Sequence, residues 1–172
     1  LGMTVSFHNH LSPDLTRDDI ILRKVIENKN GITFFSEDWD FSCYFESISG
    51  KWYSYHFWVY SFLNIPAFSL LHKFDLNELR CFQITNAFLL LLSLWSIVVF
   101  YQASSFKKLL FFMLAAFNPV LFYIPWTHPE IFSYSFILLS VIFALNSNFR
   151  IAVLMSSIAS LQNPAISIVP LF

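Results

Sequence analysis

The sequence predicts an all-α membrane protein, with a polar N-terminal segment on the outer face, containing short amphipathic helices, followed by about four transmembrane helices. From Ile84 to Phe172 the chain is apolar apart from short polar breaks, and the first stretch, ITNAFLLLLSLWSIVVFY, carries no charge. About 20 mainly apolar residues are needed to cross a bilayer core as a helix. Charged residues and histidines are instead spread from His8 to Lys51. The change near Leu79 therefore separates a polar segment from membrane helices.

The composition indicates the same class. Hydrophobic residues make up 56% of the chain, charged residues only 12%, and the mean hydropathy of +0.59 is above that of ordinary soluble domains. The net charge of −1 and the lack of a basic stripe argue against a nucleic-acid partner. Cys43 lies in the polar segment and Cys81 beside the first span, so a bridge between them is open, and the two cysteines indicate little else. The P-loop, GxGxxG, CxxC, HExxH and GxSxG motifs of soluble enzymes are absent.

Residues 1–56 form the predicted outer-face segment. Asp14 or Thr16 can cap a helix that ends at Asn30-Gly31. The remainder of this segment, residues 32–56, is expected to be rich in loops.

Residues 57–80 form the second predicted region. The stretch FWVYSFLNIPAFSLL is apolar but short and contains Pro66, which favours an interfacial or re-entrant helix over a full span. His72, Lys73 and Arg80 then form a polar elbow.

Residues 81–172 form the predicted transmembrane bundle, with spans near 83–101, 107–124, 130–146 and 151–171. Positive charge in short loops marks the cytoplasmic side. If all four spans exist, the lysines at 107–108 and Arg150 share that side. The polar segment and the WTHPE turn at 126–130 then share the opposite, periplasmic, extracellular or lumenal face of the inner or plasma membrane.

Two segments within the bundle resemble each other. Asn118-Pro119 and Asn163-Pro164 are each followed by a further proline, Pro125 and Pro170. Proline removes a backbone hydrogen bond and bends a helix. One interpretation is a pair of kinks that open a cavity towards the outer face, which makes Asn118 a substrate-binding candidate. The other is helix packing with terminating prolines.

Asp18 and Asp19 are the candidate catalytic residues, because they open the predicted helix. A carboxylate there could accept a proton from a hydroxyl nucleophile or hold a divalent metal, and no other cofactor is indicated. Simple solvation of both side chains is the alternative. His8 and His10 without a third ligand do not predict a metal site.

Two polar clusters are the candidate substrate-binding residues. His128 and Glu130 lie at the mouth of a span, where an ionisable side chain is costly unless it serves a site or reaches interfacial water. Lys51, Tyr53 and His56 could neutralise a lipid-linked phosphate. The alternatives are a turn with a Trp anchor and an aromatic belt with a snorkelling lysine.

Three stretches carry a resemblance to a known class: DDIILRKVIENKNGITFFSEDWDF, GKWYSYHFWVYSFLNIPAF and NPVLFYIPWTHPEIFSYSFILLS. These stretches resemble segments of the GT-C class of integral-membrane glycosyltransferases. The first is similar in its acidic helix and polar turn, the second in its G-x-x-Y-S-x-H pattern before an apolar helix, and the third in its NP…TxE turn. Ile20 and Ile21 stand where members commonly have aromatic residues.

The resemblance implies hexosyl or mannosyl transfer from a polyprenyl-phosphate sugar, with membrane lipid and the lipid-linked donor as partners. It places the catalytic base or acceptor-orienting role on Asp18 or Asp19, with Asp38 as the fallback. Lys51 and His56 would face the donor phosphate, and His128 with Glu130 would line the site from the opposite turn.

The chain starts at Leu1 and ends inside an apolar segment, so we expect a fragment that lacks an earlier span and later ones and is inactive in isolation. The alternative function is a non-catalytic membrane component, such as a transporter segment or an assembly partner. A transporter needs polar groups near the midplane, where Asn86, Asn118, Gln162 and Asn163 are available.

Overall fold

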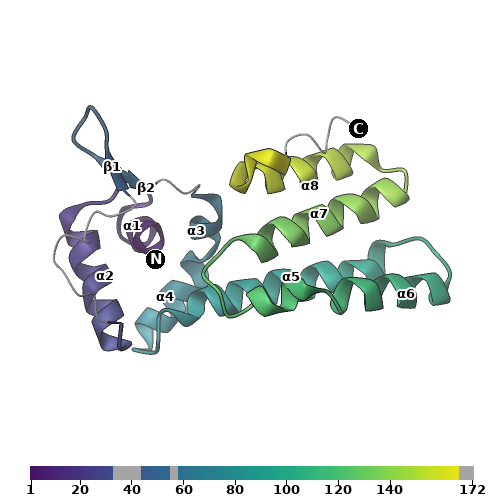
Figure 1. Cartoon of the computed structure of the whole chain (residues 1–172), viewed down its shortest axis with the longest axis horizontal. Coiled ribbons are helices and arrows are strands. Elements are labelled where there is room, and N and C mark those ends of the chain that lie inside the picture. Colours follow the sequence, from purple (N-terminus) through teal and green to yellow (C-terminus); the bar gives the residue numbers. More distant parts are fainter. Residues whose placement is uncertain (33–43, 55–57, 167–172) are drawn as a thin grey trace. The chain divides into compact units, whose positions relative to one another are not determined.

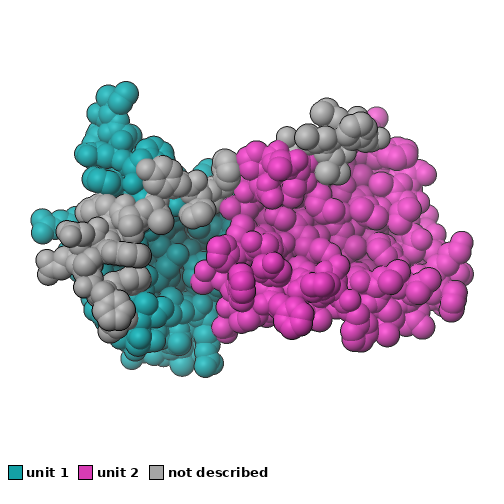
Figure 2. Space-filling model, in the orientation of Figure 1, with its two compact units in different colours: residues 1–82 teal, residues 83–172 magenta. Residues whose placement is uncertain are grey.

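The computed structural model describes residues 1–32, 44–54 and 58–166, and the fold is mostly helical, as predicted. The chain divides into two compact units, residues 1–82 and 83–172 (Figure 2). Among the described residues one helix, Arg80–Phe100, is long and apolar enough to cross a membrane, and two shorter apolar helices are Glu130–Leu145 and Phe149–Gln162. The four-span arrangement therefore stays a prediction.

The first unit is built around α1 (Figure 1). Its helices are α1 (Gly2–His10), α2 (Arg17–Lys29), α3 (Val59–Leu63) and α4 (Ile65–Lys73), and α1 contacts the other three. Helix α1 is buried from Gly2 to Phe7. Gly2 has no room for a side chain, because the Tyr44 hydroxyl and a Leu15 methyl group pack against its α-carbon.

Helix α2 begins and ends where the sequence predicts. Thr16 is the N-cap and forms a capping box with Asp19, in which each side chain accepts a hydrogen bond from the other residue's backbone amide. Asn30 is the C-cap, and Gly31 follows with φ +77°, a left-handed conformation that glycine adopts without strain. These signals are local, so the sequence alone could predict them.

A short hairpin lies in the region expected to be loops. Strands β1 (Tyr44–Glu46) and β2 (Trp52–Ser54) pair antiparallel, with Phe45 opposite Tyr53. The hairpin is tied to the start of α2, because the Leu15 amide donates to the Trp52 carbonyl at 2.7 Å. Met3, Leu15 and Ile20 form a small core against which Tyr44 and Trp52 pack.

The prediction of a single helix within residues 57–71 is wrong. The described part of this stretch forms two helices, α3 and α4, which meet at Asn64. Pro66 lies in the first turn of α4, where its missing amide hydrogen is not needed. After α4, the buried Glu78 accepts from Lys29 Nζ at 3.2 Å, which fastens the end of α2 to the polar elbow.

The second unit contains most of α5 (Arg80–Phe100) and three further α-helices, which run along a common direction (Figure 1). They are α6 (Ser105–Ala116), α7 (Glu130–Leu145) and α8 (Phe149–Gln162), with the 3-10 helix η2 (Pro119–Tyr123) between α6 and α7. Helices α7 and α8 pack against each other.

The predicted helices 107–124 and 151–171 both end before their Asn-Pro pair, at Ala116 and Gln162. The Asn118 side chain accepts from the Val120 amide at 3.0 Å, and the Asn163 side chain accepts from the Ala165 amide at 3.2 Å. At both Asn-Pro pairs the helix ends and does not bend, which agrees with terminating prolines and not with kinks, while Pro170 lies outside the described residues. The residue before a proline disfavours α-helical geometry, and asparagine stabilises the turn that follows.

Candidate functional site

A pocket of about 690 Å³ lies beside the start of α2, a volume typical of small-molecule sites. Its lining combines positive charge with apolar surface: Asp14, Leu15, Thr16, Arg17, Ile20, Ile21, Lys24, Gly50, Lys51 and Trp52. Three of these are cations, and they come from α2 and from the turn before β2. The pocket is therefore suited to a ligand that has both an anionic and an apolar part.

Lys51 and Asp14 form an ion pair in this pocket, with Nζ 3.0 Å from Oδ2. Asp14 is buried, whereas Lys51 is more than half exposed. A hydrogen bond from the Ser12 hydroxyl lowers the pKa of Asp14, burial raises it, and Lys51 lowers it further, so that the net direction is downward. Asp14 in turn raises the pKa of Lys51. Both groups are charged at neutral pH.

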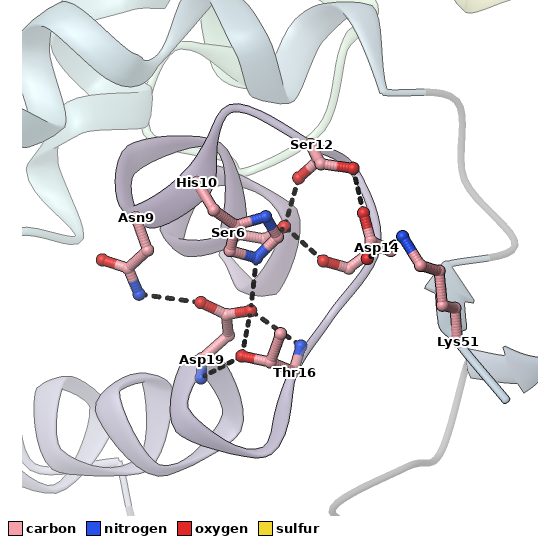
Figure 3. A network of polar contacts seen from close by, with 8 residues as sticks. All are labelled: Ser6, Asn9, His10, Ser12, Asp14, Thr16, Asp19 and Lys51. Atoms are coloured by element: carbon pink, nitrogen blue, oxygen red, sulfur yellow. Dashed lines mark hydrogen bonds and ion pairs between the residues drawn. The ribbon is translucent and has the colours of Figure 1, made fainter.

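Asp19 is fully buried beside this pocket, surrounded by hydrogen-bond donors (Figure 3). Asn9 donates to Oδ1 at 2.7 Å, and Oδ2 lies 2.9 Å from His10 Nε2. The backbone amide and hydroxyl of Thr16 also donate to Oδ2, at 2.7 and 2.8 Å. Burial raises the pKa of Asp19, but these hydrogen bonds outweigh it and the pKa is lowered.

Asp18 differs from Asp19 although both lie in the first turn of α2. Its side chain is exposed, while that of Asp19 is enclosed. A saturated, enclosed carboxylate with a lowered pKa is a poor proton acceptor, so the structure gives Asp19 a positioning role in the capping box. Of the two candidates, Asp18 is the one that a substrate can reach.

The structure brings one predicted phosphate-facing residue, Lys51, to the start of α2. Tyr53 lies on the adjacent strand β2, where its ring stacks on that of Phe45 with centroids 5.9 Å apart. His56 and Asp38 lie outside the described residues.

The second unit holds the other candidates. Glu130 is exposed in the first turn of α7, and the exposed His128 ring lies 5.9 Å from that of Trp126. Asn118 is occupied as the cap of η2. Buried Asn86 holds the chain leading into the WTHPE turn, because its Nδ2 donates to the carbonyls of Tyr123, Ile124 and Trp126 at 3.2, 3.2 and 2.9 Å.

Two pocket residues, Arg17 and Lys24, were missed by sequence reasoning. Part of the pocket lining could have been found in the sequence, because four of its residues have the spacing of one helix face: Arg17, Ile20, Ile21 and Lys24. Within residues 1–32, 44–54 and 58–166, His, Cys, Asp and Glu side chains do not gather in any group of three that could hold a metal ion. No known protein family, curated protein or solved structure matches the chain.

Proposed function

We propose that the chain is part of a membrane glycosyltransferase that moves a sugar from a lipid-phosphate carrier on the periplasmic or lumenal face. The observation that carries this proposal is the mixed lining of the pocket at the start of α2, with Arg17, Lys24 and Lys51 beside Ile21 and Trp52. A lipid-phosphate sugar has the same two characters, an anionic group and an apolar chain. Helix α5, which is long and apolar enough to cross a bilayer, supports a membrane location, where a lipid carrier would be dissolved.

The reaction is a displacement at the anomeric carbon of the donor. The acceptor hydroxyl oxygen bonds to that carbon, the bond to the phosphate oxygen breaks, and the lipid phosphate leaves with the electron pair. We assign the proton of the acceptor hydroxyl to Asp18, which does not line the pocket itself but is exposed next to the pocket residue Arg17 in the first turn of α2. Asp19 keeps the first turn of α2 in place through Thr16 and Asn9.

The transporter alternative has less support, because the asparagines it would need are occupied. Asn86 donates to three carbonyls, and the side-chain oxygens of Asn118 and Asn163 accept backbone amides. These contacts are sufficient to explain why polar side chains lie within an apolar unit.

The proposal is tested by sugar transfer in membranes that contain the full-length protein, with labelled polyprenyl-phosphate hexoses as donors. Asp18→Asn is expected to lower transfer at least about 100-fold, the usual contribution of a general base, while membrane insertion and donor binding persist. Lys73→Ala is the control, because Lys73 is an exposed charged residue of the same unit that lies at the end of α4 and not in the first turn of α2. Full activity of the Asp18→Asn protein removes Asp18 from the mechanism, and a lack of transfer with every donor favours a non-catalytic component.

A further inference from the structure

The Asp14–Lys51 ion pair marks the place of an anionic oxygen inside the pocket. Asp14 Oδ2 lies 3.0 Å from Lys51 Nζ, and Figure 3 shows the lysine ammonium directed at the carboxylate. Ser12 donates to the other carboxylate oxygen of Asp14, and the Ser6 hydroxyl donates to the Asp14 backbone carbonyl at 2.7 Å. The carboxylate is thus fixed by α1 and its following loop, whereas the lysine reaches it from the hairpin.

The two partners differ in freedom. The Asp14 side chain is 9% exposed and is held by its neighbours, whereas the Lys51 side chain is 56% exposed. Lys51 is the solvated member of the pair, so it is the partner that can turn towards another anion, while Asp14 keeps its hydrogen bond from Ser12. Lys51 can therefore leave Asp14 without disturbing the small core of the unit.

The remaining charges of the lining favour an incoming anion. Arg17 and Lys24 are the other charged side chains of the pocket, and both are positive. The phosphate monoester of a prenyl phosphate has three terminal oxygens and, near cations, up to two negative charges, whereas a carboxylate has two oxygens and one charge. Ile21 and Trp52 offer apolar surface next to this charge, which a free inorganic anion would not use.

We infer that the phosphate of a lipid-linked ligand binds Lys51 in place of the Asp14 carboxylate, so that Asp14 is a built-in competitor for the pocket. This inference rests on the proposed function for the identity of the ligand. The ligand class is a prenyl phosphate, with its phosphate oxygen at the Lys51 ammonium and its first apolar units against Ile21 and Trp52. Arg17 and Lys24 supply the remaining positive charge.

The competitor role makes an unusual prediction, because removing a residue that lines the pocket should tighten binding. Asp14→Asn keeps the size of the side chain and abolishes its charge, so Lys51 is released for the ligand. We expect farnesyl phosphate to bind this variant about 3- to 10-fold more tightly. Lys51→Ala should weaken binding about 10-fold, in line with the loss of one charge-assisted hydrogen bond.

The experiment is isothermal titration of the full-length protein in detergent with farnesyl phosphate, farnesol and inorganic phosphate. Lys73→Ala is again the control and should bind farnesyl phosphate like the unaltered protein. Farnesol should bind weakly and respond to neither pocket variant, since it has no charge. Inorganic phosphate should bind more weakly than farnesyl phosphate but respond to Asp14→Asn in the same direction.

Three results would overturn the inference: weaker binding to the Asp14→Asn protein, equal affinities for Lys51→Ala and Lys73→Ala, or farnesol binding as tightly as farnesyl phosphate. If Asp14→Asn fails to fold by circular dichroism, Lys51→Ala decides alone, because Lys51 is exposed. The proposed function is judged separately. If the variants bind farnesyl phosphate as expected but the protein transfers no sugar, the phosphate site stands and the proposed enzyme activity fails. If the protein transfers sugar and both variants have an unchanged KM for the donor, the enzyme activity stands and the phosphate site fails.

Discussion

Asp19 is a carboxylate enclosed by protein, and its two oxygens accept four hydrogen bonds. Asp19→Asn keeps the shape of the side chain but removes the charge and replaces one acceptor by a donor. We expect the free energy of unfolding to fall by about 2–3 kcal/mol, because a hydrogen bond to a charged group contributes about 1.5–3 kcal/mol. Denaturant unfolding of the purified protein, followed by circular dichroism, measures this change.

Asp18→Asn is the matched control for this residue, because Asp18 is exposed one position earlier. Its free energy of unfolding should change by less than about 0.5 kcal/mol. Burial raises the Asp19 pKa, but hydrogen bonds bring it below its ordinary value of 3.8. The stability that Asp19 contributes is therefore present above about pH 4 and is lost as the pH falls through the lowered pKa. Equal stability losses in the two variants would contradict the positioning role of Asp19.

At the scale of the element, helix α2 and the hairpin show what could be predicted from the sequence. Helix α2 was predictable because Thr16, Asp19 and Gly31 act on residues no more than a few positions away. The pocket was not, because it depends on Lys51 and Trp52 reaching the start of α2 across more than thirty residues of chain. Neither hydrophobic periodicity nor a capping motif predicts the contact between the hairpin and the start of α2. This contact arises from the small core that the hairpin and α2 share.

A side chain of α5, Asn86, contacts the end of η2 and the chain between η2 and α7. Asn86→Leu removes the donor shared by the carbonyls of Tyr123, Ile124 and Trp126 and places an apolar group against them. Because the fully buried Asn86 loses its three hydrogen bonds to these carbonyls, we expect a loss of about 2 kcal/mol in the free energy of unfolding. Denaturation in detergent, followed by circular dichroism, measures the loss.

Ser96→Ala is the control on the same helix. Ser96 is also buried, but its hydroxyl donates only to the Leu92 carbonyl within α5. We expect a change below about 0.5 kcal/mol, because that carbonyl keeps its helical environment. If Asn86→Leu is as stable as Ser96→Ala, the turn is held by contacts other than the Asn86 amide.

At the scale of the whole molecule, the lengths of the helices bear on the membrane arrangement. Helix α5 has 21 residues, or about 31 Å at 1.5 Å per residue, which matches a bilayer core of about 30 Å. Helices α6, α7 and α8 have 12, 16 and 14 residues, or about 18, 24 and 21 Å. Sequence hydropathy does not resolve this difference, because the Asn-Pro pairs end α6 and α8 inside apolar stretches.

The predicted topology places the hairpin turn and the WTHPE turn on the same side of the membrane. Single cysteines at Ser49 and Thr127, both exposed, test this after Cys43 and Cys81 are replaced. We expect a membrane-impermeant maleimide to label both positions in intact cells. Cysteines at Ser104 and Asn148, which are exposed just before α6 with its lysines at 107–108 and α8 with its Arg150, should be labelled only after the cells are permeabilised.

The result separates the membrane topology from the chemistry. Labelling of positions 49 and 127 from one side would support the predicted topology. Labelling of these two positions from opposite sides would exclude the WTHPE turn from the site, while the pocket beside α2, which lies within the first unit, would keep its charge and its volume. Labelling of positions 104 and 127 from the same side would show that the chain between them does not cross the bilayer, and would remove the second predicted span.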